Sequence, residues 1–260
     1  MAIDEALFLS AIGGQAPPTV RLYSWSRPTL SIGFRQNLEE TCDLEACRRL
    51  RIETVRRPSG GRAVLHDREL TYCVAAGAEG PFRGLSVRSV YRWVSHVLHR
   101  CLKRKGVPID PLPSSSKHSP AARPVNDALP CFAVPTGHEL TSGGRKLVGS
   151  AQKWSRRGFM QHGSILLGLD RALWSKVVGP GPANELQAVG INELGKRPLS
   201  TSELMKDLAA EFEQAMGQPA TEHDLSAFEM ETAQRLAESK YSSDDWSAYQ
   251  RDFAGLDKAV

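Results

Sequence analysis

The sequence predicts an α+β fold with a helical C-terminal tail. Two blocks rich in β-forming residues, beginning at Arg21 and at Cys131, are punctuated by glycine turns, and one long amphipathic helix separates them. After Pro198 the pattern changes to apolar residues four positions apart, which is typical of helices. We therefore place a boundary near Pro198, between a body of residues 1–198 and a helical extension of residues 199–260 that packs on it.

The first block contains helices and strands in alternation. MAIDEALFLSAIGG predicts an amphipathic helix that ends at the glycine pair, with Asp4 and Glu5 in its first turn to complement the helix dipole. RLYSWSRPTLSIGF predicts two strands broken by Arg27–Pro28. DLEACRRL predicts a short helix with Asp43 as its N-cap. IETVRR and AVLHDRELTYCVAAG predict strands on either side of a charged, glycine-containing turn.

The clearest helix runs from Ser86 to Gly106. Its apolar residues fall at helical spacing, and Gly106 stands where a C-cap is expected. The other face is basic, which is explained either by a solvated surface whose cations complement the helix dipole or by a docking surface for an acidic partner. The residues of this basic face are Arg88, Arg92, His96, His99, Arg100, Lys103, Arg104 and Lys105.

The remaining segments complete the α+β pattern. LPSSSKHSPAARPVND predicts a long loop. CFAVPTGHEL, RKLVGSAQKW and MQHGSILLGL predict a second set of strands, with turns at 141–144 and 156–158. STSELMKDLAAEFEQAMG and TEHDLSAFEMETAQRLAESKY each predict a helix in the tail.

The composition favours an ordinary globular protein of the cytoplasm. Of the 260 residues, 41% are hydrophobic and 24% are charged, and no apolar run is long enough to cross a bilayer. The five cysteines have no metal-binding spacing, so we expect reduced thiols and no metal site. The net charge of +4 fits an acidic protein partner but decides little, and we expect neither a nucleic acid nor a membrane as partner.

Two glycine-containing segments, RRPSGGRAVLHD and GGRKLVGSAQ, are candidates for ligand binding. Glycine pairs allow the backbone to approach a ligand closely, although neither segment has the pattern of a phosphate loop. From spacing alone, two ordinary hairpins with charged surfaces remain the simpler interpretation. Strand alternation places Lys146, Val148, Ser150 and Gln152 on one face and Leu147, Gly149 and Ala151 on the other.

Several motifs together resemble one family. RRPSGGRAVLHDRELTY is similar to the first signature of the lipoate–biotin protein ligase and octanoyltransferase superfamily, and GGRKLVGSAQ followed by QHGSILL is similar to the second. PTLSIGFRQN, MAIDEALF and KYSSDDW resemble flanking elements of the same family. The resemblance extends from Met1 to about Trp246. Its specificity comes from the shared order of the motifs.

This resemblance implies mixed and antiparallel sheets around an acyl-binding cleft flanked by helices, with residues 1–198 as the acyltransferase catalytic domain. Lys146 corresponds to the functional lysine that meets the acyl carbonyl, where an ammonium stabilises a developing oxyanion. His66 is expected in the cleft wall without a proton-transfer role, and His162 in its floor. The substrate-binding residues implied by the resemblance are Arg57, Ser59, Gly60, Gly61, His66, Gly149, Ser150, Ala151, His162 and Gly163.

The segment around Cys131 resembles the cysteine-dependent octanoyltransferase branch, in which CF precedes a glutamate, here Glu139. This implies that Cys131 is the nucleophile that carries the acyl group, and that Lys146 activates it and later takes part in proton transfer with the incoming amine. A neighbouring ammonium increases the thiolate fraction of a thiol. Taken alone, Cys131 also fits a buried structural cysteine. The remaining thiols, Cys42, Cys47, Cys73 and Cys101, are expected in the core or at the surface.

The branch further implies the reaction and its partners. The expected donor is octanoyl-acyl carrier protein, and the expected acceptor is a lysine of a lipoyl domain or of glycine cleavage H protein, in lipoate biosynthesis by a monomer that needs no cofactor. Three alternatives remain open: an ATP-dependent lipoate or biotin protein ligase, a lipoyl or octanoyl amidotransferase between carrier domains, and a non-catalytic acyl- or carrier-binding protein. The presence of both Cys131 and Lys146 disfavours the last of these.

Overall fold

The computed structural model describes residues 1–112, 131–132, 139–184, 186–195 and 197–247. The predicted loop of residues 112–127 lies almost wholly outside this part, as does most of the CFAVPTGHEL segment. In chain order the elements are α1 (Ala2–Ile12), β1 (Thr19–Tyr23), β2 (Thr29–Ile32), α2 (Leu38–Thr41), α3 (Leu44–Leu50), β3 (Glu53–Arg56), β4 (Val64–His66), β5 (Glu69–Gly77), a 3-10 turn (Gly80–Phe82), α4 (Val87–Arg104), β6 (Thr141–Ser142), β7 (Arg145–Lys146), β8 (Val148–Ser155), β9 (Gly158–Leu166), α5 (Arg171–Val178), α6 (Pro180–Asn184), a 3-10 turn (Ile191–Glu193), α7 (Thr201–Met216), α8 (Ala227–Leu236) with a π-helical turn (Ala237–Tyr241), and α9 (Asp244–Ser247).

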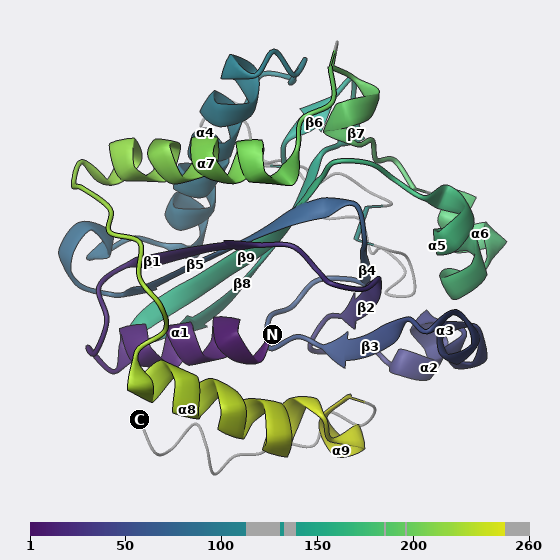
Figure 1. Cartoon of the computed structure of the whole chain (residues 1–260), viewed down its shortest axis with the longest axis horizontal. Helices are drawn as coiled ribbons and strands as arrows, with labels where there is room; N and C mark the ends of the chain where they lie inside the picture. Colours follow the sequence, from purple (N-terminus) through teal and green to yellow (C-terminus); the bar gives the residue numbers. More distant parts are fainter. Residues whose placement is uncertain (113–130, 133–138, 185, 196, 248–260) are drawn as a thin grey trace.

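The described strands form the antiparallel and mixed sheets that the sequence predicts. The largest sheet is antiparallel, in the order β1-β5-β9-β8. A three-stranded sheet, β3-β2-β4, is mixed because β2 is parallel to β3 and antiparallel to β4. β6 and β7 form a two-stranded ribbon. In Figure 1 the three-stranded sheet lies at one end of the large sheet.

Helices cover both faces of the large sheet. Figure 1 shows α4 and α7 on one side of it and α1 and α8 on the other. Successive side chains of a strand point to opposite faces, so β5, buried along almost its whole length, contributes to two cores. Leu70, Tyr72, Val74 and Ala76 belong to the core under α4 and α7, whereas Cys73 and Ala75 pack on the α1 side.

The long helix α4 confirms the predicted helix and the glycine at its end, and it also has a serine cap at its start. The Ser86 hydroxyl accepts a hydrogen bond from the Ser89 backbone N–H at its start, and Gly106 follows its end with a φ of +75°. Part of its basic face binds α7, because Arg100 and Arg104 both contact the buried carboxylate of Glu211.

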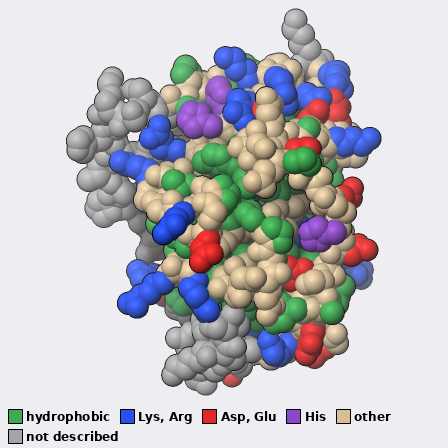
Figure 2. All heavy atoms as spheres, turned by 90° about the vertical axis from the view of Figure 1, so that its left-hand side faces the viewer, with side chains coloured by type: hydrophobic (Ala, Val, Ile, Leu, Met, Phe, Trp, Pro, Cys, Tyr) green, Lys and Arg blue, Asp and Glu red, His purple; other side chains and the backbone are tan. Residues whose placement is uncertain are grey.

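Lys105 likewise pairs with two carboxylates of α7, Glu203 and Asp207. These contacts give the C-terminal end of the basic face a structural role. On the face turned toward the viewer in Figure 2, Lys and Arg side chains are interspersed with acidic ones around a hydrophobic centre. Docking of an acidic partner on α4 therefore remains a prediction that concerns mainly its N-terminal half.

The helices after Pro198 contact the body at several places. α7 places Leu204, Leu208 and Phe212 in the core under α4, and α8 packs against α1. The sequence predicts one helix from Thr221 onward, but α8 begins only after Ser226. The reason is a capping box, in which Ser226 caps the helix and the Glu229 carboxylate accepts from the Ser226 backbone N–H. The division at Pro198 remains a prediction.

The helix α1 is buried almost all round, and its two acidic residues are core groups. Asp4 accepts hydrogen bonds from Arg21 and Tyr23 of β1. Glu5 accepts from Lys153 and Lys240. Their role is thus larger than the predicted complement to the helix dipole. Within the described residues, no helix has the length and apolar character that crossing a membrane requires.

Candidate active site

A cleft opens where the α1 face of the large sheet meets the three-stranded sheet. Its empty space, counted together with adjoining open solvent, is about 340 Å³. Ser31, Val64, Thr71 and Ser164 contribute to its wall. The predicted site residues that line it are Arg57, His66, Cys131, Gly149, Ser150, Ala151, His162 and Gly163. Ser59 and Lys146 are buried and Gly60 and Gly61 are exposed, and these four do not line the cleft.

Cys131 and Lys146 meet beside this cleft. The Lys146 ammonium donates to the Cys131 carbonyl oxygen at 2.9 Å and lies 3.5 Å from the Cys131 sulfur. It also donates to the Glu139 carboxylate. The Lys146 side chain is 1% exposed, whereas Cys131 is partly exposed and borders the cleft. The cation is therefore enclosed, and the partly exposed cysteine borders the cleft.

A backbone bridge holds the two residues together. The Cys131 N–H donates to the Ala63 carbonyl at 2.9 Å, directly after the glycine turn. The Gln187 N–H donates to the Phe132 carbonyl at 2.9 Å, and the Gln187 carbonyl accepts from the Lys146 N–H at 2.7 Å. The segment around Gln187 thus connects the cysteine to β7.

The electrostatic environment keeps Lys146 charged. Burial alone lowers the pKa of its ammonium, but the Cys131 sulfur and the Glu139 carboxylate outweigh this effect and hold the pKa above its usual value. The positive charge of Lys146 thus lies 3.5 Å from the Cys131 sulfur. The Lys146 ammonium also lies 5.3 Å from the centre of the Phe132 ring, whose face attracts cations.

The predicted alternation from Lys146 to Gln152 is broken between Leu147 and Val148, so Lys146 and Leu147 each lie on the side opposite to the one predicted relative to the residues that follow. Gly149 shares the Cys131 side with Lys146, since a Cβ atom at Gly149 would lie 3.0 Å from the Phe132 ring and 3.5 Å from the Cys131 sulfur. The order of the two faces is reversed after Leu147 because β7 ends at Lys146 and β8 begins at Val148. Leu147 and Val148 therefore both point into the core under α4. The strand is interrupted there, so the two-residue period does not continue across Leu147.

The charged turn after β3 is both a connector and a part of the cleft. The buried Arg57 side chain donates to the carbonyls of Ser31, Gly60 and Arg62 and to the Ser31 hydroxyl. Burial lowers the pKa of its guanidinium to about 10, which leaves it charged at neutral pH. Gly61 has a φ of +91°, a conformation that favours glycine. Arg57 therefore holds the turn closed and supplies positive charge to the cleft.

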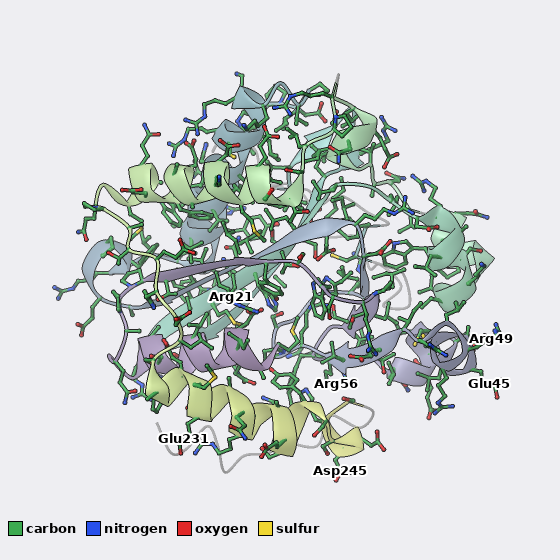
Figure 3. All side chains as sticks on the ribbon, viewed as in Figure 1. Arg21, Glu45, Arg49, Arg56, Glu231 and Asp245 are labelled. Carbon is green, nitrogen blue, oxygen red and sulfur yellow. The ribbon has the colours of Figure 1, made fainter. Side chains whose placement is uncertain are left out.

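Arg56, the neighbour of Arg57, binds the C-terminal part of the chain. Its guanidinium donates to the carbonyls of Trp246 and Ser247, and the Trp246 indole N–H donates back to the Arg56 carbonyl at 2.8 Å. Figure 3 shows Arg56 between β3 and the end of the chain that carries α9. The tail motif KYSSDDW therefore fixes the strand that leads into the turn.

Two buried histidines are paired with serines and carboxylates. His66 lies 2.7 Å from both the Ser31 hydroxyl and the Glu69 carboxylate, and its ring stacks on Trp25. His162 lies 2.5 Å from the Ser59 hydroxyl and 3.5 Å from the Asp4 carboxylate.

Burial lowers the pKa of His162, against the opposing effect of Asp4, so that its ring is neutral at pH 7. Asp4 keeps its charge, because the hydrogen bond from His162 and the positive charge of Arg21 outweigh its burial and hold its pKa below the usual value.

Sequence reasoning missed several residues that shape this site. Ser31 and Glu69 complete the surroundings of His66, and strand alternation offered no signal for them. A Cβ atom at Gly33 would lie 1.8 Å from the Gly61 carbonyl oxygen, so Gly33 allows the turn to pack against β2. The only signal for Gly33 was its place in PTLSIGFRQN. Within the described residues, no group of three His, Cys, Asp or Glu is arranged to hold a metal ion.

Comparison with known proteins identifies the family. Residues 1–213 match the model of the lipoyl protein ligase A/B catalytic domain. The chain belongs to this family. Curated relatives include octanoyltransferase LipM of Kyrpidia tusciae, which is 39% identical over 95% of this chain and 93% of its own length, and octanoyltransferase LipM of Bacillus subtilis, which is 35% identical over 96% of this chain and 93% of its own length.

Solved structures of this family confirm the predicted fold. A crystal structure of lipoate-protein ligase A bound with ATP has a TM-score of 0.76 and covers 95% of this chain and 92% of its own, at 22% identity. A bipartite lipoate protein ligase of Thermoplasma acidophilum, described with its E2 lipoyl domain, has a TM-score of 0.76 and covers 96% of this chain and 91% of its own, at 20% identity. The protein is an enzyme of this ligase and transferase family, an acyltransferase.

Proposed function

We propose that this protein is an octanoyltransferase that carries the octanoyl group on the Cys131 sulfur between a donor and an acceptor. The relatives that cover nearly the whole chain are octanoyltransferases. The observation that carries the cysteine assignment is the meeting of a cleft-facing thiol with a buried ammonium at 3.5 Å. A structural cysteine has no need of a charged partner of this kind.

The reaction proceeds in two half-reactions. In the first, the Cys131 thiolate attacks the carbonyl carbon of an octanoyl thioester, the carbon–sulfur bond to the donor breaks, and the donor leaves as a thiolate that takes up a proton from solvent. In the second, the amine of an acceptor lysine attacks the Cys131 thioester and an amide forms. The Lys146 ammonium stabilises the oxyanion in both steps and remains beside the departing thiolate. The thioester already supplies the activation that a ligase obtains from ATP.

The partners follow from this chemistry. The donor we propose is octanoyl-acyl carrier protein, and the acceptor is the lysine of a lipoyl domain or of glycine cleavage H protein, in the cytoplasm and with the enzyme as a monomer. The ligase of Thermoplasma acidophilum among the structural neighbours is described with an E2 lipoyl domain, which supports an acceptor of this kind. The positive charges of Arg57 and Lys146 near the cleft suit a thioester whose carbonyl oxygen gains negative charge.

The test compares three donors for one lipoyl-domain acceptor, with mass spectrometry of the acceptor as the readout. Octanoyl-acyl carrier protein without ATP or Mg²⁺ is expected to octanoylate the acceptor. Free octanoate with ATP and Mg²⁺ is expected to give no product, and product formed only there would favour an ATP-dependent ligase. Product formed only from an octanoylated H protein would favour an amidotransferase.

A further inference from the structure

The cleft contains a polar relay that the cysteine–lysine pair does not use. Glu69 is a carboxylate with no hydrogen to donate, so the 2.7 Å contact requires that His66 donates from Nδ1. His66 Nε2 is then an acceptor, and the Ser31 hydroxyl at 2.7 Å donates to it. The Arg57 guanidinium donates to the same hydroxyl at 3.1 Å, which leaves the Ser31 hydrogen free to point at His66. The order serine, histidine, carboxylate is that of a proton relay.

The residues of this relay line the cleft in which the reaction is proposed to take place. Ser31 and His66 line the same cleft as Cys131, together with Thr71 and Ser164. The last two hold Glu69 in place by donating to one of its oxygens, at 2.6 and 2.9 Å. The indole of Trp25 stacks on the His66 ring with centroids 4.3 Å apart, which fixes the ring plane. The ring is thus oriented, with its Nε2 atom against the Ser31 hydroxyl.

The second half-reaction needs a proton acceptor, and the charged Lys146, which the family resemblance gives a part in this proton transfer, is not suited to accept the proton. When a lysine amine attacks a thioester, its nitrogen must lose a proton for the amide to form. Lys146 has a raised pKa and is already an ammonium, so it donates hydrogen bonds and has no lone pair for this proton. The first half-reaction differs, because a thiolate attacks and has no proton to lose.

His66 is better placed for this proton than His162. A proton on His66 would be compensated by Glu69, whose described hydrogen-bond donors besides His66 are the neutral hydroxyls of Thr71 and Ser164. The other Glu69 oxygen is buried and has no hydrogen-bond partner among the described residues. The carboxylate near His162 is Asp4, which already forms an ion pair with Arg21 at 2.5 Å. A positive charge on His162 would therefore be stabilised less by Asp4 than a positive charge on His66 would be by Glu69.

We propose that His66, supported by Glu69 and reached through the Ser31 hydroxyl, accepts the proton of the acceptor amine in the second half-reaction. As the nitrogen–carbon bond forms, the Ser31 hydroxyl takes the proton from the nitrogen and passes its own proton to His66 Nε2. The bond between the carbon and the Cys131 sulfur breaks, the thiolate remains beside Lys146, and protonated His66 pairs with Glu69 until the proton passes to solvent. This inference rests on the proposed function, because it needs a Cys131 thioester.

The test separates loading of Cys131 from its discharge. Wild type, His66→Gln and Ser31→Ala are loaded with octanoyl-acyl carrier protein, and intact mass is followed by rapid quench. Each loaded enzyme is then discharged with a lipoyl-domain lysine or with hydroxylamine, a small and strongly nucleophilic amine whose proton can pass directly to water. In His66→Gln we expect loading close to wild type and discharge to lysine slower by roughly 10²–10⁴-fold. Discharge to hydroxylamine is expected to fall much less.

The controls distinguish this role from a structural one. His162→Gln removes the other cleft histidine and is expected to slow loading and discharge to a similar degree. Ser31→Ala removes one hydroxyl and is expected to reproduce the His66→Gln pattern in a milder form. Unchanged discharge to lysine, or an equal loss of loading and of both discharge reactions in His66→Gln, would overturn the proposal. A wild-type enzyme that forms no adduct would instead refute the proposed function.

Discussion

At the scale of single residues, one buried cation serves two partners. The Lys146 ammonium contacts both the Cys131 sulfur and the Glu139 carboxylate, so the carboxylate balances the charge of the lysine and orients it toward the thiol. An ammonium buried without such partners would lose its proton, since burial lowers the pKa of an amine. The network therefore explains how a lysine that is 1% exposed remains a cation beside the reacting sulfur.

The substitution Lys146→Met tests this role. It removes the charge while keeping an unbranched side chain, and we expect kcat to fall by roughly 10²–10³-fold, as for the loss of an oxyanion donor. It also leaves Glu139 without this cation, at a cost to folding of about 3–5 kcal/mol. The matched control is the double variant Lys146→Met with Glu139→Leu, which should recover stability in urea unfolding without recovering activity. Recovery of activity in the double variant would contradict the account.

At the scale of elements, the charged turn is shaped by close approach of two backbone segments. Gly33 follows β2 directly, and its α-carbon leaves room only for hydrogen next to the Gly61 carbonyl. Phe34 then donates its N–H to the Ser59 carbonyl at 2.9 Å, which closes the turn against β2. The position of Arg57 in the cleft depends on this contact.

Alanine substitutions in the two segments should therefore have different effects on folding stability. Gly33→Ala puts a methyl group 1.8 Å from a backbone oxygen, which forces the turn away from β2. We expect a loss of folding stability of roughly 1–3 kcal/mol from this overpacking. Gly60→Ala meets nothing within 4 Å and should leave the melting temperature close to wild type. Equal melting temperatures for the two variants would show that the close approach is unimportant.

Elements with local signals were predictable from the sequence. The cap at Asp43 and the helix that starts at Ser86 are found as expected, and the alternating and glycine-bounded segments form strands. The helices α5 and α6 received no prediction, although Asp170 caps α5 in the usual way, because they are too short to show a clear period. The break between β7 and β8 has no local signal either. The break lies next to the pairing of β7 with Gln187, which is distant in sequence.

At the scale of the whole molecule, residues far apart in the sequence complete the site. The network at His66 joins β2, β4, β5 and β9, and no pattern within one segment indicates such a meeting. The family resemblance located Cys131 and Lys146 and is confirmed by the match over residues 1–213. The roles assigned to these two residues remain predictions. The C-terminal helices also contribute a long-range contact, because the Lys240 ammonium donates a hydrogen bond to the Glu5 carboxylate of α1.

The pairing of Glu5 predicts a pH-dependent stability. Burial raises the pKa of this carboxyl, but Lys153 and Lys240 outweigh burial and hold the pKa below its usual value of 4.5. A lowered folded-state pKa contributes stability above pH 4.5, and this contribution is lost as the pH falls through the folded-state pKa. Glu5→Gln should therefore lose about 3–5 kcal/mol near pH 7 and progressively less at acidic pH.

Urea unfolding at pH 7 and at acidic pH measures this difference. The matched control is Glu231→Gln, because Glu231 is an exposed carboxylate that projects from the outer side of α8 in Figure 3. It should change stability little at either pH. A Glu5→Gln penalty that stays constant across the pH range would show that the ion pairs of Glu5 do not stabilise the fold.

The central claim is that the Cys131 sulfur carries the acyl group, and mass spectrometry of the intact enzyme tests it most directly. After incubation with octanoyl-acyl carrier protein alone, the wild-type chain should gain one octanoyl group, and the peptide that contains Cys131 should carry it. The Cys131→Ala variant should gain none and should transfer nothing to a lipoyl domain. An octanoyl adduct on Cys131→Ala, or wild-type transfer rates in that variant, would contradict the account.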